Sequence, residues 1–300
     1  MNTQPYENHT SGYVAILGAP NAGKSTLLNR VLGQKISITS KKPQTTRNRI
    51  LGVLHRPSAQ VVFLDTPGVH RAHNPLNMRI VDTALATLAD VDLILFVADA
   101  TAPDKASESL LAEKLGAQRK PVILALNKVD LIEKPKLLLL IDEWSQRMEF
   151  KAVVPISAKH GIQVEDLILS MEAELPKGPP FFPEDSLTDM SERFLASELI
   201  REKAFRLTGQ ELPYAVAVTI DDYTIGKQGR LTRIHATIHV ERNSQKGIVI
   251  GKKGAKLKQI GEAARMEIQR LVGTKVFLKL FVRVQKNWSK DTKALQRFGY

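Results

Sequence analysis

A glycine-rich stretch near the N-terminus ends in a lysine and a hydroxyl residue. Its sequence, Gly18-Ala19-Pro20-Asn21-Ala22-Gly23-Lys24-Ser25, fits the pattern G-x-x-x-x-G-K-[ST] without a gap. The two glycines let the backbone curl so that successive N–H groups face phosphates. The lysine supplies a positive charge to the β- and γ-phosphates, and the serine supplies a hydroxyl to Mg²⁺. The stretch therefore predicts a nucleoside triphosphate site in which Lys24 acts on the reacting phosphate.

Two further segments have the residue types that complete a phosphate site. Asp65-Thr66-Pro67-Gly68 offers a carboxylate that can hold Mg²⁺, usually through a water, and the Gly68 N–H, which can reach the γ-phosphate. In Gln44-Thr45-Thr46-Arg47, a threonine hydroxyl can complete the Mg²⁺ shell only while the γ-phosphate is present. Thr46 is favoured over Thr45, with little to separate them. Ser25, Thr46 and Asp65 are the expected metal ligands, and Lys24, Thr46 and Gly68 the groups expected to act in hydrolysis.

Another pair of segments predicts that the base is guanine. The carboxylate of Asp130 in Asn127-Lys128-Val129-Asp130 can accept hydrogen bonds from the N1–H and the exocyclic amino group of guanine. Adenine lacks these donors and would leave the buried charge unpaired. Ser157-Ala158-Lys159 can add a backbone N–H to the guanine O6, although this motif is weak alone. The predicted nucleotide contacts are Gly18 to Ser25, Asp65 to Val69, Asn127, Lys128, Asp130, Ser157 and Ala158.

Except for Gln44-Thr45-Thr46-Arg47, which lies between the first helix and the second strand, each of these motifs follows a short apolar run rich in β-branched residues. Such runs are typical of strands in a parallel sheet that is covered on both faces. Amphipathic stretches such as 25–32 separate the runs, and the alternation predicts a doubly wound α/β domain. The runs are Tyr13–Leu17, Gln60–Leu64, Asp92–Asp99, Pro121–Leu126 and Val153–Ile156.

The length of 300 residues suggests two domains, and a proline-rich segment separates them. Prolines at 176, 179, 180 and 183 exclude a regular element there, so we expect a GTP-binding domain over 1–175, a linker over 176–190 and a second domain over 191–300. The absence of cysteine excludes a disulfide scaffold and thiolate zinc sites. No apolar run is long enough for a membrane span, and the polar start predicts no secretory signal.

The positive charge lies in the last third of the chain. Residues 201–300 hold 21 basic and 8 acidic residues, whereas residues 1–200 hold 22 and 23. Such asymmetry indicates a polyanionic partner. A helix capped by Asp189 is expected first, followed by strands over 214–220 and 231–240, a helix over 255–272 and a strand over 275–284.

A lysine-bearing G-x-x-G turn precedes the helix expected over 255–272. Gly251 and Gly254 allow a close turn from which Lys252 and Lys253 project. This arrangement clamps a single-stranded phosphate backbone, as KH modules do, and the order of elements resembles a type II KH domain. Apolar residues 248–250 can form the groove for the bases. The predicted RNA contacts are Ile250, Gly251, Lys252, Lys253, Gly254, Lys256 and Lys258.

The ordered nucleotide motifs resemble those of Ras-superfamily GTPases of the translation-factor-related class. One position departs from Ras-like enzymes, because Val69 stands where they carry the glutamine that orients the attacking water. Hydrolysis is therefore intrinsically slow, or another group or a partner positions the water. In the subgroup with a hydrophobic residue there, an asparagine matching Asn21 can hold a potassium ion near the phosphates, and the resemblance implies the same here.

The combination of a GTPase domain, a proline-rich linker and a type II KH domain resembles the Era family over almost the whole chain. The resemblance implies GTP or GDP with Mg²⁺ as ligands, binding to the single-stranded 3′ region of 16S rRNA, and assistance in assembly of the small (30S) ribosomal subunit. It also implies a cytoplasmic protein, expected to be a monomer, with possible peripheral contact to the anionic inner membrane. Beyond the motifs, it includes Ile36-Ser37-Ile38-Thr39-Ser40, Phe182-Pro183-Glu184-Asp185 and Ala196-Ser197-Glu198-Leu199-Ile200-Arg201-Glu202.

Two other functions compete with a GTP-dependent RNA-binding switch. A GTP-driven RNA-modifying factor is disfavoured because the sequence has no second catalytic constellation. A regulator that places its basic face on anionic lipid is the other alternative, and a salt-sensitive preference for liposomes over RNA would support it.

Overall fold

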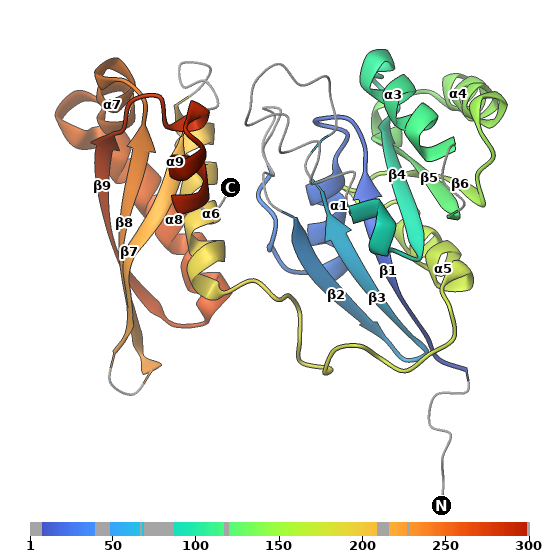
Figure 1. Ribbon diagram of the computed structural model, residues 1–300, viewed down its shortest axis with the longest axis horizontal. Coiled ribbons are helices and arrows are strands. Elements are labelled where there is room, and N and C mark those ends of the chain that lie inside the picture. The colour runs from blue at the N-terminus through green and yellow to red at the C-terminus, as the bar shows by residue number, and fades with distance from the viewer. Residues whose placement is uncertain are drawn as a thin grey trace, which may run out of the picture. The chain divides into compact units, whose positions relative to one another are not determined.

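The computed structural model divides the chain into two compact units, whose main boundary lies between Asp189 and Met190. Each unit has a sheet of its own, in blue to green for the first and in orange to red for the second (Figure 1). The structure describes residues 8–39, 49–66, 68, 87–116, 120–208, 216–226 and 229–298.

The first unit is built on a six-stranded sheet with the order β2-β3-β1-β4-β5-β6. Five strands are parallel, and β2 (Ile50–Arg56) pairs antiparallel with β3 at the edge. The central strands are buried on both faces, which explains their continuous apolar sequences. The sequence analysis missed β2, whose residues include a glycine, a histidine and an arginine. The parallel strands are β1 (Thr10–Leu17), β3 (Ala59–Asp65), β4 (Leu93–Asp99), β5 (Val122–Asn127) and β6 (Ala152–Ile156).

Helices connect the parallel strands and complete the α/β layering (Figure 1). Trp144 on α4 is buried and meets Phe96 of β4 edge-to-face at 5.1 Å between ring centroids, so this tryptophan serves packing. Because the parallel strands share one direction, their carboxyl ends lie at one edge of the sheet, where the motifs follow them. The helices are α1 (Lys24–Leu32), α3 (Lys105–Gly116), α4 (Lys134–Arg147) and α5 (Val164–Glu174).

The proline-rich segment is hydrogen-bonded to the first unit. The buried Gln60 amide accepts from the N–H groups of Phe181 and Phe182 at 2.7 and 2.9 Å and donates to the Phe182 carbonyl at 2.8 Å. The Phe181 ring stacks on Tyr13 at 5.3 Å. Further along, the Val53 N–H of β2 donates to the Leu187 carbonyl at 2.8 Å. Residues 181–188, hereafter the edge segment, thereby cover part of the outer edge of the sheet.

The second unit packs two long helices on one face of a three-stranded sheet. Strand β8 (Leu231–Val240) lies in the centre, antiparallel to β7 (Ala217–Ile225) and parallel to β9 (Lys275–Val284). Helices α6 (Glu192–Leu207) and α8 (Ala255–Val272) bury their apolar residues against alternate residues of the strands. The remaining helices are α7 (Asn243–Ile250) and α9 (Thr292–Arg297).

Two expectations for this unit need correction. Ser191, not Asp189, caps α6, because its hydroxyl accepts from the Phe194 N–H at 3.2 Å. The strand expected over 214–220 runs over 217–225 in the structure, and residues 214 and 215 lie outside the described ranges. Its second half is polar and exposed, so it lacks the apolar pattern by which strands are found. The helix over 255–272 and the strand over 275–284 are confirmed.

The C-terminal segment after β9 was not foreseen as structured. Trp288 is fully buried and meets Phe298 edge-to-face at 5.1 Å, and Phe298 lies 4.6 Å from the His239 ring. This segment therefore covers the end of the sheet around His239. Within the residues that the structure describes, no helix is long and apolar enough to cross a membrane.

Candidate functional site

The phosphate loop connects β1 to α1 in a conformation that glycine makes possible. A Cβ on Gly18 (φ 156°) would lie 2.2 Å from the Val97 carbonyl oxygen, and one on Gly23 (φ 103°) would lie 2.1 Å from the Asn127 side-chain nitrogen. No side chain is accommodated at either position. Asn21 also has a positive φ of 64°, and its side chain is exposed. The loop continues directly into the N-terminus of α1, where backbone N–H groups favour the binding of anions.

Lys24 is buried at the first position of α1. Its Nζ donates to the carbonyls of Gly18 and Ala19 at 3.0 and 2.9 Å. Burial lowers the pKa of Lys24 to about 8, and the negative charge of Asp65 opposes this effect. The loop thus holds a cation in place before any phosphate is bound.

Asp65, at the end of β3, is completely buried beside two hydroxyls. Ser25 and Ser37 donate to its Oδ2 at 2.9 and 2.8 Å. Its Oδ1 is buried and has no hydrogen-bond partner among the described residues. Burial raises the pKa of Asp65, and Lys24 and the two hydroxyls counteract the rise. A carboxylate with a spare buried oxygen next to a hydroxyl is a donor set that fits Mg²⁺.

The sequence analysis gave no site role to Ser37 or to Asn29, the residue that positions it. The Asn29 side chain, on α1, accepts from the N–H groups of Ile36 and Ser37 at 3.0 Å each and donates to the Ser37 carbonyl at 2.6 Å. This clamp holds the Ser37 hydroxyl against Asp65. No sequence pattern links Asn29, Ser37 and Asp65, because their contacts depend on how the chain folds back after α1.

Asn127 joins the phosphate loop to the expected guanine loops. Its amide donates to the Ala22 carbonyl at 2.7 Å and accepts from the Ala158 N–H at 3.0 Å, and the residue is 3% exposed. Arg30 of α1 holds the same loop from its other side by donating to the carbonyls of Ala158, at 3.2 Å, and Lys159. Sequence reasoning predicted Asn127 but missed Arg30.

The remaining guanine-side residues lie together at the ends of β5 and β6. Lys128 has a positive φ of 69° and forms an ion pair with Asp99 of β4. A hydrogen bond from Ser157 lowers the pKa of Asp130. Asp130 is therefore ionised at neutral pH, as acceptance of two base N–H groups requires.

The residues around Asp65 fall partly outside the described ranges. Thr66 is buried and donates through Oγ1 to the Ile16 carbonyl at 2.8 Å, so its hydroxyl ties β3 to β1. Gly68 lies against the loop, since a Cβ there would be 3.0 Å from the backbone nitrogen of Pro20. Residues predicted as contacts that lie outside the described ranges are Thr46, Pro67 and Val69.

In the second unit the G-x-x-G turn separates α7 from α8. Gly251 (φ 69°) has no room for a side chain, since a Cβ would lie 2.6 Å from the Lys256 Cβ. Gly254 has φ 82° with open space around it. Lys252, Lys253 and Lys258 are exposed, whereas Lys256 and Ile250 are half-buried.

A groove of about 410 Å³ runs from this turn between α8 and β9. Its floor is apolar and its rim is charged, with Lys258 3.9 Å from Glu262. The sequence analysis assigned residues 248–250 to this groove, but none of the three lines it, and Val249 is fully buried in the core. The lining residues are Gly254, Leu257, Lys258, Gly261, Glu262, Arg265, Leu278, Lys279 and Leu280.

Comparison with known proteins matches both units. Residues 13–128 match the family described as 50S ribosome-binding GTPase, and residues 211–289 match the KH domain family. The chain is 52% identical over 300 residues to the GTPase Era of Geobacter metallireducens, covering 100% of both chains. It is 53% identical to the GTPase Era of Geotalea uraniireducens, covering 97% of both.

Two solved structures resemble the whole chain. One is a variant of Aquifex aeolicus Era bound to GDP and aluminium fluoride, with a TM-score of 0.92, 41% identity and coverage of 97% of this chain and 99% of that chain. The other is Era in complex with MgGDPNP and nucleotides 1506–1542 of 16S ribosomal RNA, with a TM-score of 0.93, 42% identity and the same coverage. The phosphate loop, the G-x-x-G turn and these full-length matches agree, and the chain belongs to the Era family of GTPases.

Proposed function

We propose that this GTPase is a switch whose output is binding to the single-stranded 3′ region of 16S rRNA, and that this binding assists assembly of the small (30S) ribosomal subunit. The observation that carries the proposal is the presence on one chain of a buried phosphate loop and an exposed lysine-bearing turn beside a groove. The complex of an Era protein with 16S nucleotides supports the choice of RNA.

Within the nucleotide site, the predicted residues have separate roles. Lys24 neutralises the β- and γ-phosphates, and Asp130 selects guanine. Ser25 and Asp65 would hold Mg²⁺, with Thr46 as the expected third ligand. When bound, the ion neutralises charge that develops on the phosphate oxygens. Asn127 contacts neither phosphate in this scheme. Its hydrogen bonds to Ala22 and Ala158 hold the phosphate loop and the loop after β6 together.

The aliphatic Val69 cannot orient the attacking water. We propose that a potassium ion beside Asn21 supplies the missing positive charge, on the strength of the resemblance of the phosphate loop. Faster hydrolysis in potassium than in sodium buffer, abolished by Asn21→Ala, would support this role. Equal rates in the two buffers would exclude it.

We further propose a cytoplasmic monomer that can contact an anionic membrane surface peripherally. The excess of basic residues in residues 201–300 supports an anionic partner, and lipid headgroups compete with RNA for that role. Binding to anionic vesicles that exceeds binding to RNA at equal salt would favour the lipid alternative.

The test of the RNA assignment compares two charge reversals. Lys252→Asp with Lys253→Asp alters the turn, and Lys134→Asp with Lys136→Asp alters two exposed lysines of α4 as the matched control. An RNA that copies the 3′ end of 16S rRNA should lose about 100-fold in affinity for the first variant and change little for the second. Equal losses in both variants would mean that RNA binds non-specifically to charge.

A further inference from the structure

The face of the second sheet that points away from α6 and α8 has an unusual composition along β9. Alternate residues of this strand pack toward the core, while the others are exposed. Phe277 and Phe281 are among the exposed ones, at 51% and 46%. The outward-facing residues of β9, hereafter the outer β9 row, are Lys275, Phe277, Lys279, Phe281 and Arg283.

Both rings are accompanied by cationic or polar groups. The Lys279 Nζ lies 5.2 Å from the centroid of the Phe281 ring, and His235 of β8 meets Phe277 at 6.5 Å. Arg233, beside Phe277 in the strand register, is exposed. The rings are four residues apart on one strand, which is about 13 Å. Each ring therefore offers a separate apolar surface beside a positive charge.

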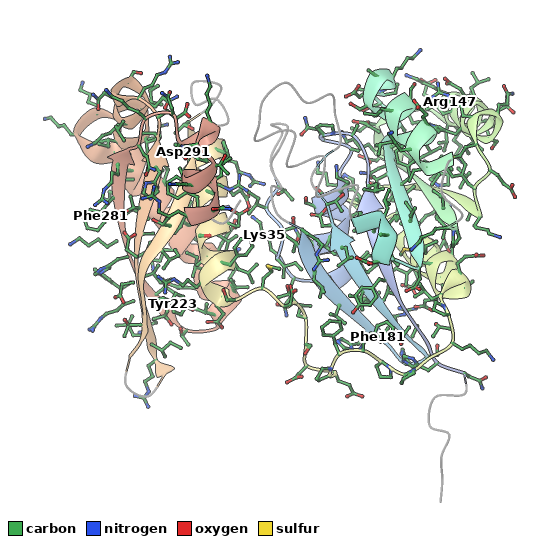
Figure 2. All side chains as sticks on the ribbon, viewed as in Figure 1. Lys35, Arg147, Phe181, Tyr223, Phe281 and Asp291 are labelled. Carbon is green, nitrogen blue, oxygen red and sulfur yellow. The ribbon has the colours of Figure 1, made fainter. Side chains whose placement is uncertain are left out.

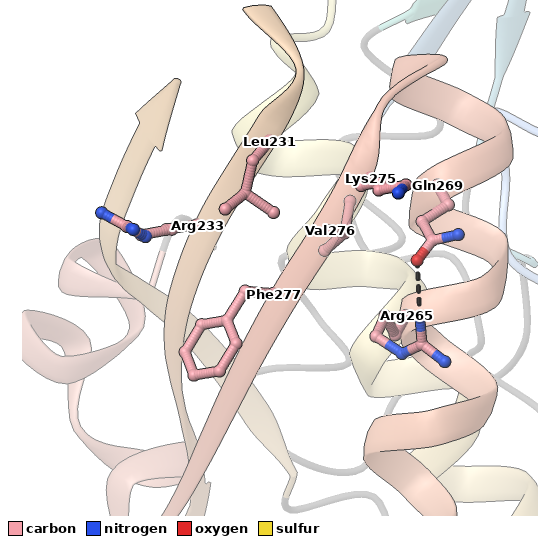
Figure 3. A pocket seen from close by; sticks show the side chains of 7 residues that line it. All are labelled: Leu231, Arg233, Arg265, Gln269, Lys275, Val276 and Phe277. Atoms are coloured by element: carbon pink, nitrogen blue, oxygen red, sulfur yellow. Dashed lines mark hydrogen bonds between the residues drawn. The ribbon is translucent and has the colours of Figure 1, made fainter. Parts of the chain in front are cut away.

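The outer β9 row is continuous with the groove of the G-x-x-G turn. Lys279 lines that groove and also contacts Phe281. Arg265 of α8 lines the groove and also a second cavity, of about 610 Å³, which includes Phe277, Arg233 and Lys275. In Figure 3, Phe277 lies beside β8, while Arg265 and Gln269 approach β9 from α8. Figure 2 labels Phe281 at the surface of the second unit, beside β9. Arg265 and Lys279 thus connect the two surfaces at the free edge of the sheet.

We propose that the outer β9 row is a second RNA surface, on which a single strand leaving the groove stacks bases on Phe277 and Phe281. Stacking on exposed aromatic rings tolerates any base, and flanking lysines and arginines neutralise the phosphates. This inference rests on the proposed RNA binding at the turn and extends its footprint.

An acidic membrane is the less favourable occupant of this face. Asp222 of β7 is exposed and pairs across the strands with His235, the residue of β8 that meets Phe277, so a carboxylate lies on the far side of His235 from that ring. That carboxylate repels lipid and RNA phosphates alike, but it can accept a hydrogen bond from the amino group of an RNA base. The continuity with the groove also fits a strand of RNA rather than a bilayer.

The test uses two RNAs and a matched pair of variants of the full chain. One RNA has about five nucleotides and fills only the groove, and the other has about twelve and can reach the outer β9 row. The double variant Phe277→Leu with Phe281→Leu keeps apolar bulk but removes the rings. Met266→Ala is the control, since Met266 on α8 is 53% exposed and belongs to neither cavity.

We expect the double variant to bind the longer RNA about tenfold or more weakly and the shorter RNA within about twofold of the unaltered chain. Met266→Ala should change neither affinity. Phe277→Trp places an indole in the row, and its fluorescence should be quenched by the longer RNA alone. Unchanged affinity of the double variant for the longer RNA would overturn the proposal.

Two outcomes distinguish failure of this proposal from failure of the proposed RNA binding at the G-x-x-G turn. If the short RNA does not bind, or Lys252→Asp with Lys253→Asp has no effect on it, the assignment of the turn fails, while the longer RNA still tests the rings. If the double variant loses binding to phosphatidylglycerol vesicles but not to the longer RNA, the outer β9 row is a lipid surface and the proposal is wrong.

Discussion

In the first unit, Lys24, Asp65 and Asn127 are each less than a tenth exposed, whereas in the second unit Lys252 and Lys253 extend into solvent. The nucleotide site is held by side-chain hydrogen bonds that cross between loops. The G-x-x-G turn takes its shape from two glycines, and in the proposed RNA binding its exposed lysines would contribute to affinity almost independently. A single substitution should therefore disable the first site, while the second should lose affinity in small steps unless its backbone is changed.

The largest expected effect is that of Asn127→Ala. It removes two buried hydrogen bonds, to Ala22 and Ala158, and leaves their backbone groups without those partners. We expect GDP affinity, measured by fluorescent nucleotide titration, to fall about 100-fold or more. Asn29→Ala serves as a comparison, because it disturbs the Ser37 clamp but not the guanine side. A loss of GDP affinity below about fivefold for Asn127→Ala would contradict the claim that buried side-chain hydrogen bonds hold the nucleotide site.

The two glycines of the turn offer a matched pair. Gly251→Ala forces alanine into a positive φ and places its Cβ 2.6 Å from the Lys256 Cβ. Gly254→Ala forces alanine into a positive φ without such a close contact. We expect Gly251→Ala to reduce RNA affinity about tenfold and to lower the unfolding free energy by about 1–3 kcal/mol, and Gly254→Ala to lower it by about 1 kcal/mol. Binding isotherms and thermal unfolding check both values. Equal effects of the two changes would show that crowding at Gly251 is unimportant.

Nucleotide affinity should fall as the solution becomes alkaline. Above about pH 8 the free protein loses the proton of Lys24, and phosphate binding must then take that proton up again. The dissociation constant for GDP should rise about fourfold between pH 7 and pH 8.5. Lys24→Arg keeps its proton in this range, so its affinity, although weaker, should not depend on pH. The same slope in both proteins would assign the titration to another group.

The smallest effect belongs to a single lysine of the turn. Lys252→Ala should weaken RNA binding a few-fold for every sequence and reduce the slope of log affinity against log salt by about 0.7. Affinity measured at several salt concentrations gives both numbers. A loss that depends on the RNA sequence would mean that Lys252 contacts bases.

The fold was largely predictable where local signals suffice. Strands β1, β3, β4, β5 and β6 have continuous apolar sequences, and Gly254 and Gly273 delimit α8 at both ends. Strand β2 was missed because its last residues are polar and its place depends on pairing with β3. The edge segment was expected to be part of a linker. Its contacts with Gln60 and Val53 could not be predicted, because they join residues that are far apart in the sequence.

The candidate site divides in the same way. Contiguous motifs predicted Lys24, Ser25, Asp65 and Asn127 as site residues, because phosphate and guanine binding favours these residue types at fixed spacing. Ser37 and Arg30 act through contacts made only once the chain has folded. The strand over 275–284 was predicted, but only the structure shows that Phe277 and Phe281 face outward and that Lys279 of the same row lines the groove.

The central claim is that the nucleotide state of the first unit controls RNA binding by the second. The direct measurement is the affinity of the unaltered protein for the 3′-end 16S RNA, with GDP and with a non-hydrolysable GTP analogue. We predict that the RNA affinities in the two nucleotide states differ about fivefold or more. By linkage, bound RNA should change the ratio of the affinities for the GTP analogue and GDP by the same factor. Equal RNA affinities in both states would contradict the switch and leave two independent binding sites.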